Sequence, residues 1–233
     1  MSPHSSQTST IVLLSGGLDS AVLLAHEAQH SHVWPVYVRV GLAWEALELE
    51  MVERLLAQAR FPGTIEPLSS VEFTMRDVYS PTHWAVRGQP PAYDTPDEDV
   101  YLTGRNVVLL AKAGVLAATR RAHRIALGPL GGNPFPDARP VFFDAMARAL
   151  SIGLDHDIEV ATPFLRWKKE EVIRRGLELG VPLELTLSCM NPLPGDGGTP
   201  LHCGQCSKCR ERRDAFAALG VSDPAAYAAA SPR

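Results

Sequence analysis

The stretch Ser15-Gly16-Gly17-Leu18-Asp19-Ser20 has the residue types of a phosphate-binding turn. It follows the apolar run Ile11 to Leu14 and precedes a helical pattern, which predicts a strand, a turn and a helix. Glycines allow backbone N–H groups to approach an anion closely, and a helix N-terminus attracts negative charge. Because the Asp19 carboxylate would repel a phosphate, Mg²⁺ is expected to bridge the two. Leu14 to Ser20 therefore predict a site for Mg²⁺ and a nucleoside triphosphate.

This turn differs from two common nucleotide-binding motifs, since no Gly-Lys-Ser/Thr follows the glycines and no GxGxxG is present. A tight structural turn is the alternative, but the flanking Ser and Asp residues exceed what such a turn needs. The string SGGLDS resembles the pyrophosphate loop of the N-type ATP pyrophosphatases. That resemblance implies cleavage of ATP between the α and β phosphates, with transfer of AMP to an acceptor oxygen.

The composition favours a globular protein that acts on a small molecule. The 233 residues are 45% hydrophobic and 21% charged, as expected for one sizeable core. A net charge of -4 provides no general basic field, so long nucleic acids are not expected as partners. No apolar stretch reaches the length of a membrane span, and the first residues lack the apolar block of a signal peptide. The expected location is the cytoplasm.

Four cysteines form the second chemical signal, near the end of the sequence. Cys203, Cys206 and Cys209 form a CxxCxxC string, and Cys189 precedes it across a loop rich in proline and glycine. Four thiolates satisfy a tetrahedral Zn²⁺ and leave no position for a catalytic water, which predicts a structural zinc site. An iron–sulfur cluster and unligated redox cysteines are the alternatives. His202 is expected to be a surface neighbour rather than a ligand.

Strand-like and helix-like patterns alternate along the chain, which predicts an α/β fold with a doubly wound, mostly parallel sheet. In such a sheet the ligand binds beyond the carboxyl ends of the strands, where the Ser15 to Ser20 turn lies. Residues 1–184 are expected to form this domain, with residues 185–233 as a four-cysteine segment packed on it. The expected strands are Thr10 to Leu14, Val33 to Val40, Thr64 to Leu68, Ile125 to Gly128 and Ile158 to Thr162. The expected helices are Asp19 to His30, Ala43 to Ala59, Arg105 to Arg121, Val141 to Ile152, Lys168 to Leu179 and Ser207 to Leu219.

Two segments do not fit the alternation of strands and helices. Tyr79 to Asp99, rich in proline and acids, is long enough for a lid or a contact between subunits, and a solvated insertion without a role is the alternative. The alanine-rich stretch Ala225 to Arg233 is expected to be a loose terminus.

The turn and the cysteines together resemble one family within the superfamily, the 7-cyano-7-deazaguanine synthases. The resemblance covers about Ile11 to Gly220, and further motifs occur in the family's order. They are Thr103-Gly104-Arg105-Asn106, Pro136-Asp137-Ala138-Arg139, Thr162-Pro163-Phe164 with Lys169 and Glu171, Leu187-Ser188-Cys189 and Cys203-Gly204-Gln205-Cys206. The family resemblance also implies a homodimer.

Three of the matched residues have a clear physical role beside a triphosphate. Arg105 at a helix N-terminus could bind a phosphate with two hydrogen bonds, with a surface ion pair as the alternative. Asn106 could orient a ribose or phosphate oxygen. Lys169 is unfavourable at the start of a helix unless an anion faces it. We therefore expect Asp19, Arg105 and Lys169 to be catalytic, and Leu14 to Ser20, Asn106, Arg105 and Lys169 to bind the nucleotide.

The family's chemistry is the conversion of a carboxylate to a nitrile with ATP and ammonia. The resemblance implies that a carboxylate oxygen attacks the α-phosphate, and that ammonia then displaces AMP to give an amide. A second adenylation on the amide oxygen permits loss of AMP and leaves the nitrile. Positioning and electrostatics would dominate such catalysis, because little of it needs a protein nucleophile.

The sequence departs from the family where a substrate would be recognised. Val40 to Glu45 stand where the family usually has Gln-Arg-His, Ala138 replaces a cysteine, and the loop Pro129 to Phe135 is shorter. Trp44 could stack on the base of a purine-like acid, or could be a core residue at a helix start. Glu45 could accept N–H donors of the base.

Asp137 and Arg139 could recognise donors and a carboxylate of the same acid, or could form a salt bridge with each other. Three alternatives to the deazaguanine synthase remain from the sequence. One is an AMP-forming ligase for another acid, and one is a nucleotide-binding, zinc-stabilised regulatory module without turnover. A tRNA-thiolating enzyme is the third, but it would need a cysteine free of metal.

Overall fold

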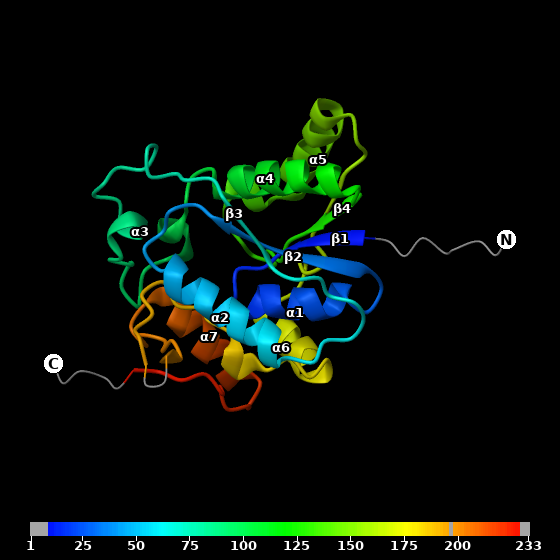
Figure 1. The fold of residues 1–233 in the computed structure, drawn as a ribbon. Helices are drawn as coiled ribbons and strands as arrows, with labels where there is room; N and C mark the ends of the chain where they lie inside the picture. The colour runs from blue at the N-terminus through cyan, green and yellow to red at the C-terminus, as the bar shows by residue number, and fades with distance from the viewer. Residues whose placement is uncertain (1–8, 196–197, 229–233) are drawn as a thin grey trace.

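The computed structural model describes residues 9–195 and 198–228, which form an α/β fold around a parallel sheet (Figure 1). The strand order is β3-β2-β1-β4-β5, and every neighbouring pair is parallel. The strands are β1 (Ser9–Leu13), β2 (His32–Arg39), β3 (Ser69–Glu72), β4 (Arg124–Ala126) and β5 (Glu159–Ala161). The expected fold class is confirmed, and β1 lies at the centre of the sheet.

Helices cover both faces of the sheet (Figure 1). One face carries α1 (Leu18–Glu27), α2 (Glu45–Gln58), α6 (Lys169–Glu178) and α7 (Ser207–Ala218), and the other carries α4 (Arg105–Arg120) and α5 (Pro140–Leu154). The short helices are α3 (Trp84–Arg87), η1 (Asp97–Val100), η2 (Pro136–Ala138) and η3 (Leu183–Leu185). Each long helix lies within a few residues of its predicted range.

The alternation of side chains along β1 explains why both faces need covering. Ile11 and Leu13 belong to the core beneath α4 and α5, whereas Val12 belongs to the core beneath α1 and α6. Successive residues of a strand point to opposite faces of the sheet. All three side chains are therefore buried only because helices cover both faces. The Ser15 to Ser20 turn therefore follows a strand that is buried in the core of the protein.

The third strand differs from the prediction, which placed it at Thr64 to Leu68. Ile65 forms only an isolated bridge with Val33, and the regular strand begins at Ser69. Pro67 explains the interruption, because proline has no N–H to donate to a neighbouring strand. The hydrophobic pattern missed the real strand because β3 lies at the sheet edge and is polar.

The segment Tyr79 to Asp99 packs on the body of the protein. The Tyr79 hydroxyl donates to the Thr103 carbonyl at 2.9 Å, and the Trp84 ring, in α3, stacks on Trp44 with centroids 5.8 Å apart. Arg210 of α7 donates to the Tyr93 carbonyl at 2.7 Å. These contacts are those of a covering segment rather than of a solvated insertion.

The prediction of a loose terminus is wrong for Ala225 to Ala228, and residues 229–233 lie outside the described residues. The Ala228 N–H donates to the His202 carbonyl at 2.9 Å, and the Tyr227 hydroxyl donates to Asp223 at 2.7 Å. The alanine content suggested looseness, but these hydrogen bonds hold the segment against the cysteine-bearing loop.

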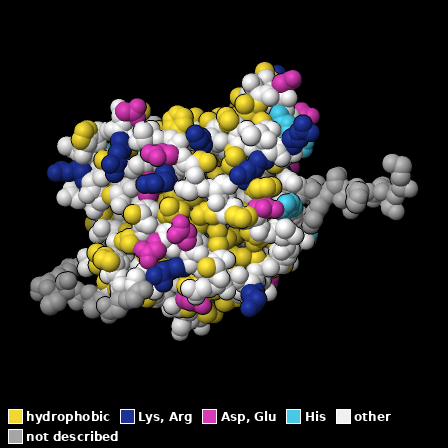
Figure 2. All heavy atoms as spheres, in the orientation of Figure 1, with side chains coloured by type: hydrophobic (Ala, Val, Ile, Leu, Met, Phe, Trp, Pro, Cys, Tyr) yellow, Lys and Arg dark blue, Asp and Glu magenta, His cyan; other side chains and the backbone are white. Residues whose placement is uncertain are grey.

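The surface in Figure 2 carries acidic and basic side chains intermixed, with hydrophobic side chains gathered near its middle. Among the described residues, no helix combines the length and apolar character that a membrane crossing requires.

Candidate active site

The Ser15 to Ser20 turn joins β1 to α1 and is closed by its own side chains. The Ser20 hydroxyl donates to the Gly17 carbonyl at 2.9 Å, and the Ser20 oxygen accepts the Ser15 N–H at 3.2 Å. Gly16 has a φ of +76°, whereas Gly17 is extended with a φ of -67° and caps α1. The first N–H groups of α1 have no carbonyl partner within the helix, so they remain able to bind an anion.

Replacing Gly16 with alanine is expected to destabilise the protein by about 2 kcal/mol, because a left-handed backbone strains any residue with a Cβ. The new methyl would also lie 2.8 Å from Cγ2 of Val52 and 3.2 Å from the Glu48 carbonyl oxygen. The free energy of unfolding in urea measures the effect. Gly17→Ala is the control and should cost far less, since its Cβ meets Ser15 Oγ at an ordinary 3.4 Å.

A cavity of about 340 Å³ opens at the carboxyl ends of β1, β2 and β4, beside this turn. Its walls come from segments far apart in the sequence, as expected for a doubly wound sheet. The predicted nucleotide-binding and substrate-binding residues in its walls are Leu14, Ser15, Gly17, Leu18, Asp19, Ser20, Trp44, Arg105, Asn106, Asp137 and Lys169. Gly16, Glu45 and Arg139 are not among the cavity-lining residues.

Three side chains in the walls carry a buried polar atom without a hydrogen-bond partner among the described residues. These atoms are Oδ1 of Asp19, Nε of Arg105 and Oδ1 of Asp137. Buried polar groups are nearly always paired in folded proteins, and unpaired ones indicate a missing ligand, ion or water. Because the three lie around one cavity, they indicate a polar ligand there. The unpaired Asp19 oxygen fits a divalent cation, which prefers carboxylate oxygens.

Lys169, at the start of α6, connects α1 to α7 at one end of the cavity. Its Nζ lies 2.6 Å from Oδ2 of Asp19 and 3.0 Å from Oε1 of Glu211. Burial opposes the charge of Lys169, but the two carboxylates outweigh it and raise the pKa of its ammonium group. Burial likewise opposes the charge of Glu211, but Lys169 and Lys208 lower the pKa of its carboxyl to about 2. Lys169 and Glu211 are therefore both ionised at neutral pH.

Arg105 and Asn106 begin α4 after Gly104, which has a left-handed φ of +76°. Asp137, from η2, accepts the Asn106 N–H on Oδ2 at 3.1 Å, and its carbonyl accepts the Asn106 side-chain amide at 2.8 Å. Burial raises the pKa of Asp137, although this backbone N–H and the Arg105 charge oppose the shift. Asp137 thus holds the helix end that presents Arg105 to the cavity.

The structure differs from the sequence expectation at Glu45 and Arg139. Glu45 is buried, and its carboxylate accepts the N–H groups of Val40 at 2.7 Å and Gly41 at 3.0 Å. Those bonds close the turn between β2 and α2 and leave the carboxylate outside the cavity. Arg139 is exposed at the start of α5. Trp44 does line the cavity, where it stacks on Trp84.

Glu48 is a cavity residue that the sequence analysis missed. It lies one turn after Glu45 on α2, and the helical period could have placed both near the turn. Its side chain is buried, and Oε2 accepts the Tyr37 hydroxyl at 2.7 Å. Burial raises the pKa of Glu48 to about 7, against the opposing effects of Arg105 and of the Tyr37 hydrogen bond.

Glu48→Gln is expected to stabilise the free protein above neutral pH. Glu48 keeps its proton in the folded protein up to about pH 7, whereas the unfolded chain loses it near 4.5. Stability is therefore lost as pH rises through this window, by about 3 kcal/mol. The amide of the variant does not titrate. The free energy of unfolding of the variant, relative to that of the wild type, should therefore increase as the pH rises from acid to alkaline. Urea unfolding at several pH values measures it, and parallel pH profiles would contradict the expectation.

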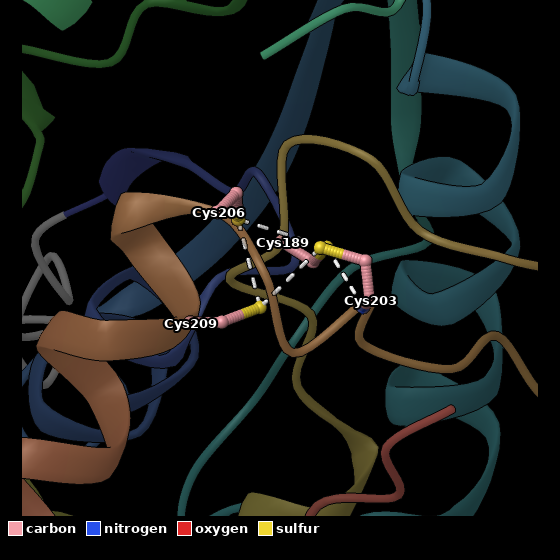
Figure 3. A group of neighbouring side chains, drawn as sticks. All are labelled: Cys189, Cys203, Cys206 and Cys209. Carbon is pink, nitrogen blue, oxygen red and sulfur yellow. Dashed lines mark hydrogen bonds between the residues drawn. The ribbon is translucent and has the colours of Figure 1, made fainter. Parts of the chain in front are cut away.

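The four cysteines converge at the start of α7 (Figure 3). Their sulfurs all lie within 4.8 Å of one another, with 3.5 Å between Cys206 and Cys209 and 4.0 Å between Cys189 and Cys206. An ion bound at about 2.3 Å at the centre of a tetrahedron separates its sulfur ligands by about 3.8 Å. The group therefore could bind a single metal ion. Cys189 also accepts the Cys203 N–H at 3.2 Å and lines the cavity, so the two sites adjoin.

The expectation that His202 is a surface neighbour is wrong. The side chain is buried, and Nε2 accepts the Ser188 N–H at 3.1 Å while the ring packs against Tyr227. Burial lowers the pKa of His202 to about 4, with a further contribution from Arg212. The neutral His202 ring therefore holds the backbone next to Cys189 through its hydrogen bond with Ser188.

Comparisons with known proteins find similar sequences over most of the chain. The family model described as "Queuosine biosynthesis protein QueC" matches residues 9–220. A 7-cyano-7-deazaguanine synthase of Methanoculleus marisnigri is 35% identical, over 93% of this chain and 97% of that protein. One of Caldicellulosiruptor bescii is 32% identical, over 93% of this chain and 96% of that protein. Among solved structures, a predicted subunit of tRNA methyltransferase from Methanocaldococcus jannaschii matches with 14% identity and a TM-score of 0.42, over 96% of this chain and 94% of that one.

Proposed function

The chain belongs to the QueC family of queuosine biosynthesis proteins, and from this we propose that it converts 7-carboxy-7-deazaguanine and ammonia to 7-cyano-7-deazaguanine. The reaction would consume ATP and release AMP and pyrophosphate. The observation that carries the proposal is the cavity beside the Ser15 to Ser20 turn. Three charged side chains there have buried atoms without a hydrogen-bond partner in the described part of the chain, as expected for a site that holds a polar, charged ligand.

The proposed chemistry has two adenylation steps. A carboxylate oxygen attacks the α-phosphorus of ATP, and the bond to the β-phosphate oxygen breaks to release pyrophosphate. Ammonia then adds to the acyl carbon, AMP leaves, and a proton is lost to give the amide. The amide oxygen attacks a second ATP in the same way. Loss of AMP and of the remaining N–H protons produces the nitrile.

The phosphate end of the cavity would lie at the Ser15 to Ser20 turn. The N–H groups at the start of α1 and the ammonium of Lys169 would bind the departing pyrophosphate, whose charge increases as the bond breaks. Arg105 has a buried Nε without a partner among the described residues, which fits a contact to a phosphate. Asp19 would hold Mg²⁺, which neutralises phosphate charge when bound.

The acid to be activated would lie in the aromatic part of the cavity. Trp44 and Trp84 stack with an interplanar angle of 12°, which provides a flat wall for a heteroaromatic base. Asp137 and Glu48 are the carboxyl groups available to accept N–H donors of that base. Glu48 thereby takes the part that the sequence alone predicts for Glu45.

The cysteine site would hold zinc in a structural role, because four thiolates complete its coordination and the sulfur separations suit one ion. An iron–sulfur cluster would need wider spacing, since several atoms would lie between the thiolates. We propose that the described part of the C-terminal segment, residues 185–195 and 198–228, forms one unit with the sheet domain. Leu187, Cys189 and Met190 share its hydrophobic core, which supports this view. A homodimer is proposed from the family alone.

The proposal is tested by pyrophosphate exchange. Labelled pyrophosphate, MgATP and the protein are incubated with or without 7-carboxy-7-deazaguanine, and incorporation of label into ATP is measured. Exchange that depends on this acid is the expected result, because reversible adenylation returns pyrophosphate to ATP. Exchange that occurs only with another acid would contradict the proposed substrate but would still support the adenylation chemistry. Tight ATP binding without exchange for any acid would contradict turnover itself.

A further inference from the structure

Four charged side chains form a chain of ion pairs at the phosphate end of the cavity. Asp19 is on α1, Lys169 on α6, and Lys208 and Glu211 on α7. Each of them lines the cavity. The two residues on α7 match none of the family motifs that the sequence analysis identified.

Glu211 bonds a different lysine with each of its oxygens. Oε1 lies 3.0 Å from Nζ of Lys169, and Oε2 lies 2.6 Å from Nζ of Lys208. The carboxylate therefore fixes the separation of the two ammonium groups. Lysine side chains are long and lose considerable rotamer freedom when ordered, so a fixed partner reduces that cost before an anion arrives.

The surroundings distinguish this arrangement from an exposed surface ion pair. The side chains of Lys169 and Glu211 are 13% and 28% exposed, and Asp19 contacts the same ammonium group from α1. Such a partly buried network holds its geometry better than an isolated exposed pair. It joins the helix after the SGGLDS turn to the helix that begins at the cysteine group.

We propose that Glu211 is a positioning residue that holds the ammonium groups of Lys169 and Lys208 together for the pyrophosphate part of the substrate. This inference rests on the proposed function only for the identity of that anion. Its consequence is that α7, which begins directly after Cys206, takes part in phosphate binding as well as in the cysteine site.

The direction in which Glu211→Gln changes the affinity for pyrophosphate separates a positioning role from simple charge repulsion. A carboxylate beside an anion site should weaken anion binding, so its removal by Glu211→Gln would tighten binding if repulsion were all. If Glu211 positions the lysines, the same substitution should weaken binding by about 10-fold, because the ammonium groups lose their common support. Isothermal titration of the whole protein with inorganic pyrophosphate and Mg²⁺ measures this.

Three further variants make the test specific. Glu211→Asp keeps the charge and should restore part of the lost affinity, which general destabilisation would not produce. Glu178→Gln, on the exposed end of α6, is the matched control and should bind as wild type. If Glu211→Gln fails to fold, Lys208→Met removes only the partly exposed ammonium and should also weaken binding. Unchanged or tighter pyrophosphate binding in Glu211→Gln, or in Lys208→Met as the substitute, would overturn the inference.

Different results would contradict the proposed function and the positioning role of Glu211. Wild-type protein that binds pyrophosphate in a Glu211-dependent way, but forms no AMP with 7-carboxy-7-deazaguanine, would contradict the function and support the positioning role. If the wild-type protein forms AMP with this acid and Glu211→Gln has the same kcat and the same KM for ATP, the proposed function would be supported and the positioning role would be contradicted. The expected result is a kcat lowered by about 10-fold or more, since the leaving pyrophosphate gains charge in the transition state.

Discussion

Replacing Lys169 with alanine is expected to lower the rate of AMP formation by about 10²-fold to 10³-fold, the usual effect of losing one preorganised group that stabilises a developing charge. The Lys169 side chain is only 13% exposed, and its ammonium group lies between two carboxylates at the end of the cavity beside the Ser15 to Ser20 turn. Removing it leaves Asp19 and Glu211 without their shared cation, so negative charge would face the departing pyrophosphate. Initial rates of AMP release at saturating MgATP measure the effect.

Lys168→Ala is the matched control for this experiment. Lys168 is the neighbouring lysine, it is exposed, and it is not among the residues that line the cavity. Its substitution should change the rate by less than about twofold, since a solvated charge is screened. Equal rate losses in the two variants would contradict the assignment of Lys169 to the phosphate end. Thermal unfolding of both variants separates a loss of chemistry from a loss of structure.

Arg212→Met is expected to lower the free energy of unfolding by about 3 to 5 kcal/mol, because breaking a buried ion pair leaves its partner charge uncompensated. Arg212 is 1% exposed and donates to both oxygens of Asp223, at 3.1 and 3.0 Å from Nε. It also donates to Oγ1 of Thr186 at 2.7 Å and to the Leu183 carbonyl at 2.9 Å. One side chain thus connects α7, the loop before Cys189 and the C-terminal segment.

Urea unfolding followed by far-ultraviolet circular dichroism measures this change. Arg174→Met is the control, since Arg174 is an exposed arginine of α6 and its loss should cost less than about 0.5 kcal/mol. A cost for Arg212→Met that matches the control would contradict the view that this arginine holds the segment together. Limited proteolysis provides a second readout, with faster cleavage expected after Leu187 in the variant.

The sequence predicted best where residue type and position have one physical meaning. Two glycines between an apolar strand and a helix require a tight turn, and the turn at Gly16 has the left-handed φ that glycine permits. Four cysteines with short spacings converge because α7 brings Cys206 and Cys209 to one side. The order of the buried strands and the long helices followed from the hydrophobic period, since a parallel sheet buries both faces, but the polar edge strand β3 did not.

Other residues could not be predicted because tertiary contacts decide their roles. Glu45 and Glu48 lie on the same helix, and only the backbone at Val40 and Gly41 shows that Glu45 is already satisfied. Trp84 reaches the cavity from a proline-rich segment that carries no periodic signal. Glu211 lies in a run of charged residues typical of a solvated helix face, and its burial depends on Lys169, which is far away in sequence.

The most direct test of the proposed function is to incubate the protein with 7-carboxy-7-deazaguanine, ¹⁵N-labelled ammonia and MgATP, and to follow the products by mass spectrometry. The account predicts a nitrile that contains the labelled nitrogen, formed with two molecules of AMP and two of pyrophosphate. An amide that accumulates with one AMP would contradict the second adenylation. Formation of ADP, or of AMP only when another acid is supplied, would contradict the assignment of this activity to the chain.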